Sequence, residues 1–260
     1  MEREKILALH GLTMKYKSVV AVDNLSFAID KGSITGLIGT NGAGKSTVVN
    51  LISGSGKPTS GEILFKGTHL EKLPADRIAR LGVARTFQNL RIFGKLSVLD
   101  NVRIAAQARH PYNFVQMSLG TRHYREQECA VTETARDVLR RLKIDQYAEA
   151  QAGSLSYGHQ RRLEIARCLA LNPELLLLDE PAAGMNPNES AELARDIRQI
   201  RKETGTTILL VEHDMSVVMS LCEYIYVMDF GILLGEGEPD TIRSNPEVIR
   251  AYLGAERKYA

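Results

Sequence analysis

The feature that most constrains the fold is residues 39–47, whose letters GTNGAGKST match the pattern G-x-x-x-x-G-K-[ST]. The apolar run 34–38 predicts a strand entering this segment, and 47–52 predicts a helix leaving it. Glycines let successive N–H groups surround a phosphate, and a helix start adds partial positive charge. The order of strand, loop and helix disfavours a chance match. The predicted nucleoside-triphosphate site comprises Gly39, Thr40, Asn41, Gly42, Ala43, Gly44, Lys45, Ser46 and Thr47.

Two side chains of this loop have separate expected tasks. Lys45 can reach the outer phosphates of a nucleotide, because its ammonium is a mobile point charge on a long stem. The Ser46 hydroxyl can bind Mg²⁺, which prefers oxygen ligands. A nucleoside triphosphate and Mg²⁺ are therefore the expected ligands of the loop.

Composition excludes several classes of protein. With 260 residues, 44% of them hydrophobic and 25% charged, the chain is typical of a globular protein. Its apolar runs, such as 175–178, are far shorter than the ~20 residues that cross a bilayer. The charged N-terminal residues do not form a secretory signal, and a net charge of +2 is no strong basic footprint for nucleic acid. We expect a cytosolic location, no membrane-spanning segment and no nucleic-acid partner.

The three cysteines predict no chemistry. Cys129, Cys168 and Cys222 are too few and too widely spaced for a disulfide framework or a zinc site. Each is expected to be a small apolar filler.

Short strands are predicted beside the phosphate loop. The segments 6–9, 12–16, 19–22, 25–29 and 61–67 indicate an antiparallel sheet. Tyr16, at the end of one strand, could offer its ring face to a purine. Packing of the same ring on the sheet surface is an equally good interpretation.

The middle of the chain is predicted to be a helical insert. Residues 81–87 are apolar except for Arg85 and lead to Gln88, whose carboxamide could bind a metal or its water, although a plain loop residue is the simpler interpretation. Helices are predicted over 97–109 and 124–142, with Pro111 and Gly120 marking a break between them.

A further helix is predicted to begin after Ser156 and run to Leu171. Ser156 suits its N-cap, and Gly158 exposes backbone N–H groups near the helix start. That arrangement suits an anion, but a simple capped helix explains it equally well.

Two acidic residues follow a strand that reads as buried on both faces. The run 175–178 is entirely leucine, as in central parallel strands, and is followed by Asp179 and Glu180. Open α/β sheets bind ligands at this edge. Asp179 can hold Mg²⁺ through water, and Glu180 can polarise an attacking water. We favour these roles over the alternative that both are solvated turn residues.

The next predicted strand, 206–211, brings His213 to the same edge, where it could contact a γ-phosphate or the attacking water. A helix is predicted before it, over 188–204. Residues 224–228 and 232–234 predict a hairpin, and 239–253 predicts two short helices separated at Pro246.

Taken in order, these motifs resemble those of ATP-binding cassette (ABC) subunits. They are GTNGAGKST, Gln88 in RTFQNLRIF, LSYGHQ at 155–160, LLLLDEP at 175–181, AAGMNP at 182–187 and His213 in VEHDM. The wording around them, such as RRLEIARCLA and the terminal PEVIRAYLG, resembles the branched-chain amino-acid importer ATPases of the LivG type.

The resemblance implies an α/β fold: a P-loop NTPase of ABC type with a mostly parallel core sheet, an antiparallel β subdomain and a helical subdomain. It divides a single domain, 1–260, into a core of 1–88 and 158–236, a helical subdomain of 89–157 and a tail of 237–260. It assigns Tyr16 to adenine stacking, Glu180 to the general base and His213 to the switch histidine. Gln88 is assigned to catalysis and, with Ser46 and Asp179, to Mg²⁺.

The same resemblance implies partners. Two such subunits, identical or paralogous, are expected to form a head-to-tail dimer in which the phosphate loop of one faces Ser156 and Gly158 of the other. The dimer is expected to work with two transmembrane permease subunits, and indirectly with a solute-binding protein, as a peripheral ATPase on the cytoplasmic face of the inner membrane. The implied activity is ATP hydrolysis that drives amino-acid import.

Three departures and two alternatives remain. Thr40 stands where many relatives have proline, His159 replaces glutamine or glycine, and Met185 replaces leucine, but none of these changes removes a catalytic group.

A lipopolysaccharide-export ATPase has a similar layout, although the RTFQ and PAAGMNP motifs favour an importer. A soluble ABC ATPase acting on DNA or the ribosome is disfavoured, since the chain has one cassette and no long heptad insert.

Overall fold

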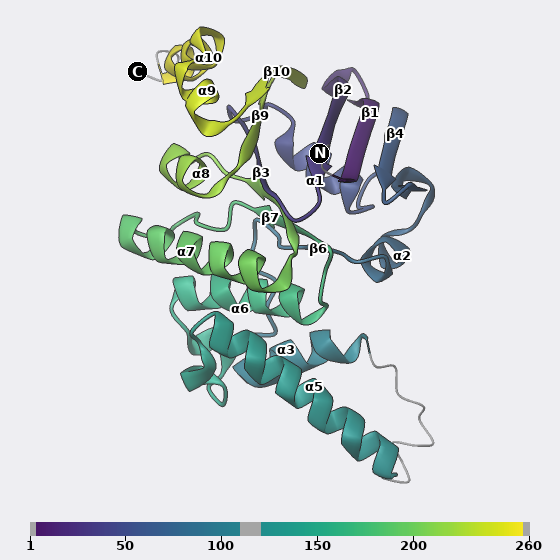
Figure 1. The fold of residues 1–260 in the computed structure, drawn as a ribbon, viewed down its shortest axis with the longest axis vertical. Coiled ribbons are helices and arrows are strands. Elements are labelled where there is room, and N and C mark those ends of the chain that lie inside the picture. Colours follow the sequence, from purple (N-terminus) through teal and green to yellow (C-terminus); the bar gives the residue numbers. More distant parts are fainter. Residues whose placement is uncertain (1–3, 110–120, 257–260) are drawn as a thin grey trace. The chain divides into compact units, whose positions relative to one another are not determined.

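The chain forms two compact units. The computed structural model describes residues 4–109 and 121–256. The first unit comprises Met1–Arg85, Glu174–Ala182 and Ile197–Ala260, and the second comprises Thr86–Pro173 and Ala183–Asp196 (Figure 1). The sequence-based division placed 158–236 with the core, whereas the compact units group 158–173 and 183–196 with the helical segments.

A six-stranded sheet is the centre of the first unit, in the order β10-β9-β3-β8-β7-β6. Neighbouring strands from β9 to β6 are parallel, and β10 is antiparallel to β9. The three strands β3, β8 and β7 are buried along their whole length, as their apolar sequences predict. The strands are β3 (Ile34–Gly39), β6 (Val83–Arg85), β7 (Leu175–Asp179), β8 (Thr207–Val211), β9 (Tyr224–Asp229) and β10 (Ile232–Gly237).

A second, antiparallel sheet has the order β2-β1-β4-β5, with β1 (Lys5–Tyr16), β2 (Val19–Asp30), β4 (Ser60–Phe65) and β5 (Thr68–His69). The expectation of four short strands over 6–29 was wrong, because β1 and β2 are each continuous over 12 residues. Register shifts interrupt their pairing without ending it. Gly11 and Asn24 have φ of +56° and +47°, a conformation that suits bulges.

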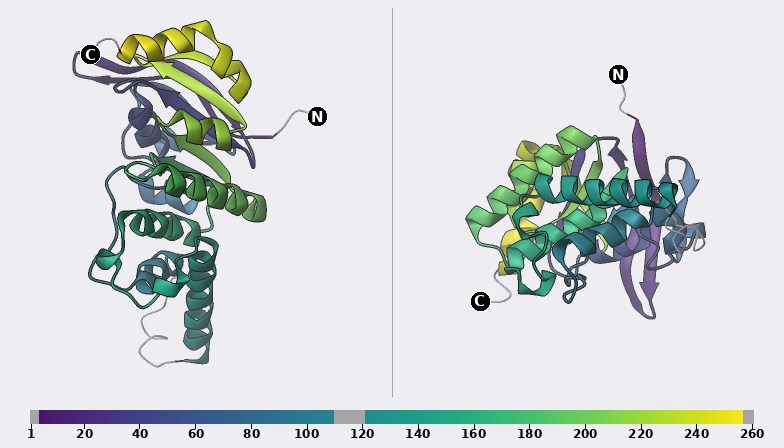
Figure 2. Two further views of the ribbon diagram at one scale, coloured as in Figure 1. Left: turned by 90° about the vertical axis from the view of Figure 1, so that its left-hand side faces the viewer. Right: turned by 90° about the horizontal axis from the view of Figure 1, so that it is seen from below.

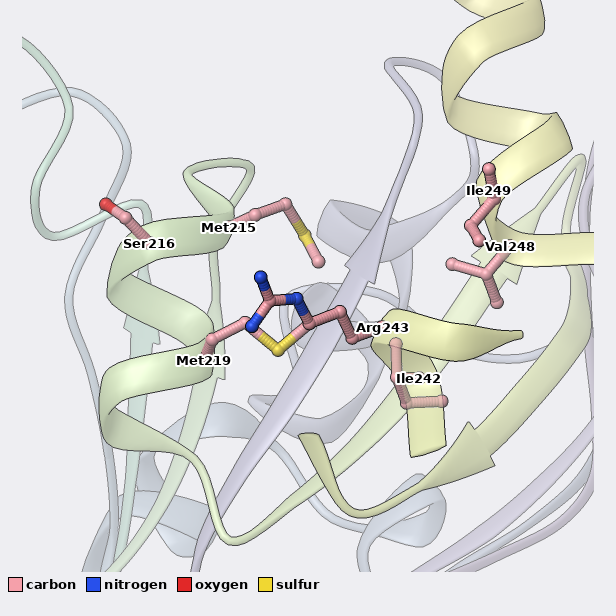
Figure 3. Close-up of a pocket in the computed structure, with 7 residues that line it drawn as sticks. All are labelled: Met215, Ser216, Met219, Ile242, Arg243, Val248 and Ile249. Atoms are coloured by element: carbon pink, nitrogen blue, oxygen red, sulfur yellow. The ribbon is translucent and has the colours of Figure 1, made fainter. Parts of the chain in front are cut away.

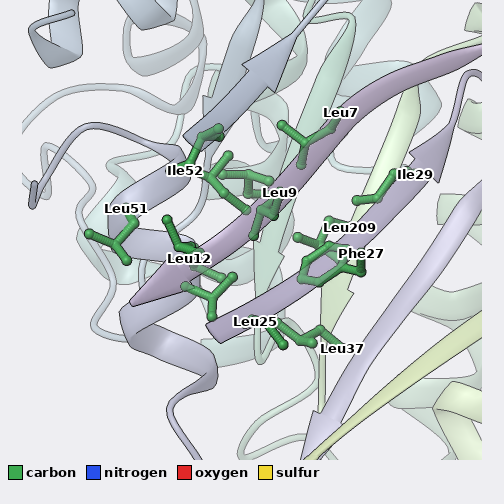
Figure 4. Close-up of a cluster of buried hydrophobic side chains, with 14 of the residues drawn as sticks. Leu7, Leu9, Leu12, Leu25, Phe27, Ile29, Leu37, Leu51, Ile52 and Leu209 are labelled. Atoms are coloured by element: carbon green, nitrogen blue, oxygen red, sulfur yellow. The ribbon is translucent and has the colours of Figure 1, made fainter. Parts of the chain in front are cut away.

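Both sheets contribute to one hydrophobic core. Side chains from β1 and β2 pack with others from β3, β8 and the helix α1 (Lys45–Ile52), as Figure 4 shows. Burial of this apolar surface is the main stabilising term for the unit. The residues drawn include Leu9, Leu12, Leu25, Phe27, Leu37, Ile52 and Leu209.

The second unit is helical, as predicted for the middle of the chain. Helices α3 (Val98–Gln107), α5 (Arg122–Arg141) and α6 (Tyr157–Ala170) contact one another, and Figure 2 shows them in teal shades. Two short 3₁₀ helices, η2 (Asp145–Tyr147) and η3 (Ala152–Ser154), precede α6. The break predicted at Pro111 and Gly120 lies outside the described residues. Helix α7 (Pro187–Thr204) contributes to both units.

Short helices complete the first unit. They are η1 (Leu70–Lys72), α2 (Ala75–Arg80), α8 (Met215–Leu221), α9 (Pro239–Ser244) and α10 (Pro246–Glu256). The predicted hairpin and the interruption before Pro246 are confirmed, since β9 and β10 pair antiparallel and α10 begins at that proline. Within the part of the chain that the structure describes, no helix combines the length and apolarity needed to cross a membrane.

Candidate functional site

The phosphate loop connects β3 to α1, as predicted, and its glycines are held in conformations that other residues rarely adopt. Gly42 and Gly44 have φ of +83° and +99°. A Cβ on Gly44 would lie 2.3 Å from the Ala21 carbonyl oxygen, and one on Gly39 would lie 2.2 Å from that of Met228. A Cβ on Gly42 would meet nothing within 4 Å. The loop is therefore packed against strands on one side and open at Gly42, which fits a phosphate cradle.

Lys45 lies within this loop as a buried cation. Its Nζ donates hydrogen bonds to the carbonyl oxygens of Gly39, at 2.7 Å, and Thr40, at 2.9 Å. Burial lowers the pKa of its ammonium, while the nearby carboxylates of Glu180 and Asp179 act in the opposite direction. The loop, its lysine and the two predicted acids thus form one electrostatic cluster.

Strand register brings the predicted polar residues to one edge of the sheet. Val211 of β8 is paired with Leu37 of β3 on one side and with Asp179 of β7 on the other. Because these strands are parallel, the residues that follow them emerge at their common carboxyl edge. Gly39, Glu180 and His213 follow from there, as the sequence predicts.

Asp179 is buried and is held by Arg85 at the end of β6. One guanidinium nitrogen of Arg85, Nη2, donates to Asp179 Oδ2 at 3.1 Å. The other, Nη1, donates to Asn50 Oδ1 at 2.6 Å and Ser53 Oγ at 3.1 Å. The sequence pattern marks Arg85 only as an interruption in an apolar run. Its role as the charge partner of Asp179 depends on the pairing of β6 with β7.

Glu180 has an unusual backbone conformation, with φ of +49°. Its N–H donates to the Val211 carbonyl at 2.8 Å, which fixes it beyond the end of the ladder. Its Oε1 lies 3.9 Å from His213 Nδ1, close but beyond hydrogen-bond distance. Strained non-glycine residues cluster at functional sites, but turn residues of this chain such as Lys66 and Phe230 have the same conformation, so the φ of Glu180 supports its role only together with its position.

Glu212 is a buried carboxylate that the sequence pattern does not single out. Its Oε1 accepts from the Ala182 N–H at 2.9 Å, and its Oε2 accepts from the His213 N–H at 3.2 Å. Burial raises the pKa of this carboxyl, and these hydrogen bonds lower it in part. Glu212 therefore ties the segment after Glu180 to the one that bears His213. Its position after a buried strand is the signal by which it could be found.

Three predicted residues, Gln88, Ser156 and Gly158, belong to the second unit, whereas the loop and the acids belong to the first. Ser156 is the N-cap of α6, as predicted, with its Oγ accepting from the His159 N–H. The backbone carbonyl of Gln88 accepts from Arg161 Nη2 at 2.7 Å. Arg161, on α6, thus connects the helix that Ser156 caps to the segment that bears Gln88.

The remaining predicted residues lie at the surface of the first unit. Tyr16 ends β1 with 47% of its surface exposed, so its ring is available to a ligand. Ser46 is exposed at the start of α1.

The expectation that each cysteine is an apolar filler was wrong for Cys129, which is exposed on α5. Cys168 and Cys222 are buried, which raises the pKa of each thiol to about 12.

The expected metal ligands contain a single carboxylate, Asp179. Among residues 4–109 and 121–256, no three His, Cys, Asp or Glu side chains form a cluster that could hold a metal ion. A magnesium ion that also binds phosphates and water does not require such a cluster, because most of its ligands are phosphate and water oxygens. The hydroxyl of Ser46 and the carboxylate of Asp179 have the chemistry that such an ion needs.

An apolar pocket of about 520 Å³ lies among α8, α9 and α10 (Figure 3). Met215 and Met219 line one side of it, and Ile242, Val248 and Ile249 line the other. Among the described residues that line it, Arg243 is the one that carries a charge. This lining does not suit a metal-bound triphosphate, so the phosphate loop is the better candidate for the nucleotide site.

Two family patterns match the sequence. The family described as ABC transporter matches residues 22–183, which include the phosphate loop, Gln88, Ser156, Asp179 and Glu180. The family described as branched-chain amino acid ATP-binding cassette transporter matches residues 233–258, in the C-terminal segment.

Individual proteins are similar over nearly the whole chain. The high-affinity branched-chain amino acid transport ATP-binding protein LivG of Escherichia coli K12 is 45% identical, over 96% of this chain and 98% of that protein. The lipopolysaccharide export system ATP-binding protein LptB of the same organism is 32% identical, over 95% and 97%. A crystal structure described as the ADP conformation of MJ1267, an ATP-binding cassette of an ABC transporter, matches with a TM-score of 0.82 and 27% identity, over 96% and 99%.

Proposed function

The chain belongs to the ABC transporter family of ATP-binding cassettes, and we propose that it hydrolyses ATP to energise a membrane importer of branched-chain or other hydrophobic amino acids. The observation that supports this most directly is the gathering of the phosphate loop, Asp179, Glu180 and His213 at one sheet edge. The match of residues 233–258 to a branched-chain amino acid cassette family supports the choice of cargo.

In this proposal the residues of the first unit bind ATP and activate water. The backbone N–H groups and Lys45 of the loop hold the phosphates, and Tyr16 stacks on the adenine. Glu180 accepts a proton from the water that attacks the γ-phosphate, and His213 contacts that phosphate or water. Ser46, Gln88 and Asp179 would each supply an oxygen ligand to Mg²⁺, and the bound ion would offset the negative charge of the phosphates.

The second unit has its proposed role in a dimer of cassettes. Ser156 and Gly158 contact the γ-phosphate held by a second cassette, which is either a copy of this chain or a paralogue. Closure of the dimer is transmitted to two transmembrane permease subunits, to which a solute-binding protein delivers the cargo. The cassette is proposed to lie at the cytoplasmic face of the inner membrane.

A lipopolysaccharide-export ATPase is the second candidate. It is supported by the 32% identity to LptB, compared with 45% to LivG. The catalytic chemistry would be the same, because cargo is selected by the other subunits of the system. The partner subunits therefore distinguish the two candidates.

Substitution of Lys45 by alanine is expected to weaken nucleotide binding roughly 10- to 100-fold, the usual worth of a hydrogen bond to a charged group. The variant loses a cation for the outer phosphates and two donors to the loop carbonyls. Isothermal titration with ADP measures the effect.

Lys31→Ala is the matched control for this variant. Lys31 forms an exposed ion pair with Glu4 in the same unit, and its loss is expected to leave ADP affinity unchanged. Equal affinities of the Lys45→Ala variant and the parent would remove Lys45 from the proposed site.

Purification of the tagged chain from detergent-solubilised membranes of its native host tests the function itself. Recovery of two multispanning permeases, a second cassette and a solute-binding protein would support an importer, and the solute-binding protein would identify the cargo. Recovery of lipopolysaccharide-export membrane subunits would favour the second candidate. Recovery of ribosomes, nucleic acid or no membrane protein would contradict both.

A further inference from the structure

The turn between β9 and β10 lies against the outer side of the phosphate loop. Pairing of β3 with β9 places Gly39 opposite Met228, so the residues that follow them, Thr40 and Asp229, are neighbours. The Thr40 Oγ1 donates to Asp229 Oδ1 at 3.1 Å. The hydroxyl that replaces the more usual proline at this position is therefore used within the first unit.

A second hydrogen bond joins the same two segments. The Gly231 N–H donates to the Ala43 carbonyl at 3.0 Å. The Gly231 carbonyl in turn accepts from the Asp23 N–H of β2 at 2.9 Å. The turn is thus fixed to β2 on one side and to the phosphate loop on the other.

The conformation of the turn makes this contact possible. Phe230 and Gly231 have φ of +42° and +86°, and Asp229 pairs with Ile232 across the hairpin. Positive φ at both central residues is the property of tight hairpin turns that match strand twist. A Cβ on Gly231 would lie 3.0 Å from the Ala21 carbonyl oxygen, so a larger residue there would strain the approach.

These contacts supply hydrogen-bond donors to the carbonyl oxygens of the loop, which a phosphate cannot do. A loop that binds an anion through its N–H groups must direct its carbonyl oxygens elsewhere, where they need donors. Here the Gly39 and Thr40 carbonyls accept from Lys45, and the Ala43 carbonyl accepts from Gly231. The β9–β10 turn therefore stabilises the carbonyl side of the loop.

We propose that Asp229 and Thr40 are positioning residues that hold the phosphate loop in its nucleotide-binding conformation, with the backbone of Gly231 as the second contact. Neither side chain needs to touch the nucleotide. Ordering of the loop before the ligand arrives removes part of the entropic cost of binding. The inference rests on the proposed function only in that this loop binds a nucleotide.

The test is ADP affinity by calorimetry in EDTA, so that metal binding does not contribute. Thr40→Val removes the hydroxyl at nearly constant volume, and Asp229→Ala removes the acceptor. Each is expected to weaken ADP binding roughly 3- to 10-fold, as loss of a charge-assisted hydrogen bond predicts. Thr40→Ser is expected to restore the affinity of the parent. The double variant is expected to be no weaker than either single variant, because both remove the same bond.

Thr204→Val is the matched control, since the Thr204 hydroxyl bonds to Ile200 and Thr206 before β8, at the opposite edge of the sheet. Its ADP affinity is expected to equal that of the parent. Additive losses from the two single variants, or parental affinity in Asp229→Ala, would overturn the proposal. If Asp229→Ala does not fold, Thr40→Val decides the test, and parental ADP affinity in that variant would equally overturn the proposal. Absence of ADP binding by the parent chain would instead contradict the proposed function.

Discussion

Replacement of Glu180 by glutamine is expected to lower ATP turnover by roughly 10²- to 10⁴-fold, the usual contribution of a general base. The amide cannot accept the proton of the attacking water at neutral pH. Its size and backbone requirements match those of glutamate, so the positive φ at this position is not further strained. Phosphate release by the assembled transporter measures turnover, and ADP calorimetry is expected to give parental affinity.

Glu174→Gln is the matched control for this substitution. Glu174 immediately precedes β7, at the edge of the sheet opposite Glu180, and forms a half-exposed ion pair with Lys66. Loss of such a pair has little effect on stability or activity. Full turnover in Glu180→Gln would exclude Glu180 as the general base.

Replacement of Arg161 by methionine is expected to destabilise the second unit by about 3–5 kcal/mol, the usual cost of breaking a buried ion pair from one side. Arg161 is only 1% exposed. Its Nη1 donates to Glu164 Oε2 at 2.8 Å and to the Phe87 carbonyl at 2.7 Å, and its Nη2 donates to the Gln88 carbonyl. Methionine fills a similar volume without any of these donors.

Urea unfolding followed by circular dichroism measures this loss as a lower midpoint. Arg136→Met is the control within the same unit, because Arg136 forms an exposed ion pair with Glu149, for which a change of about 1 kcal/mol or less is expected. An equal midpoint for the two variants would show that the Arg161 network does not stabilise the unit. Hydrogen exchange of the Phe87 and Gln88 amides is expected to accelerate in Arg161→Met.

Local patterns predict most elements of the fold, because burial on both faces and helix capping leave clear sequence signals. The leucine run 175–178 lies in β7, and Ser156 caps α6, as expected. Long strands with bulges are harder to predict from local patterns, because Gly11 and Asn24 are residue types that are typical of turns. Only pairing with the neighbouring strand shows that the chain continues through them.

The grouping of elements into units is a non-local property. Helix α6 begins within the LSYGHQ motif, and the sequence-based division assigned it to the core from residue 158 onward. Its contacts with α3 and α5 place it with the helical segments instead. The apolar pattern of a helix shows which of its faces is buried, but the element against which that face packs depends on the tertiary fold.

The sequence by itself determined the candidate residues for the chemistry of this protein: a glycine-rich loop with its lysine, two acids and a histidine after buried strands, and a capped helix. These features are local, because a glycine-rich turn or a strand end needs only its neighbours in the chain to be recognised. The tertiary structure alone decided which groups support them. Arg85 meets Asp179, Arg161 meets Gln88, and Asp229 meets Thr40. Each partner is far away in sequence, and strand register or helix packing, which no local pattern encodes, brings the two together.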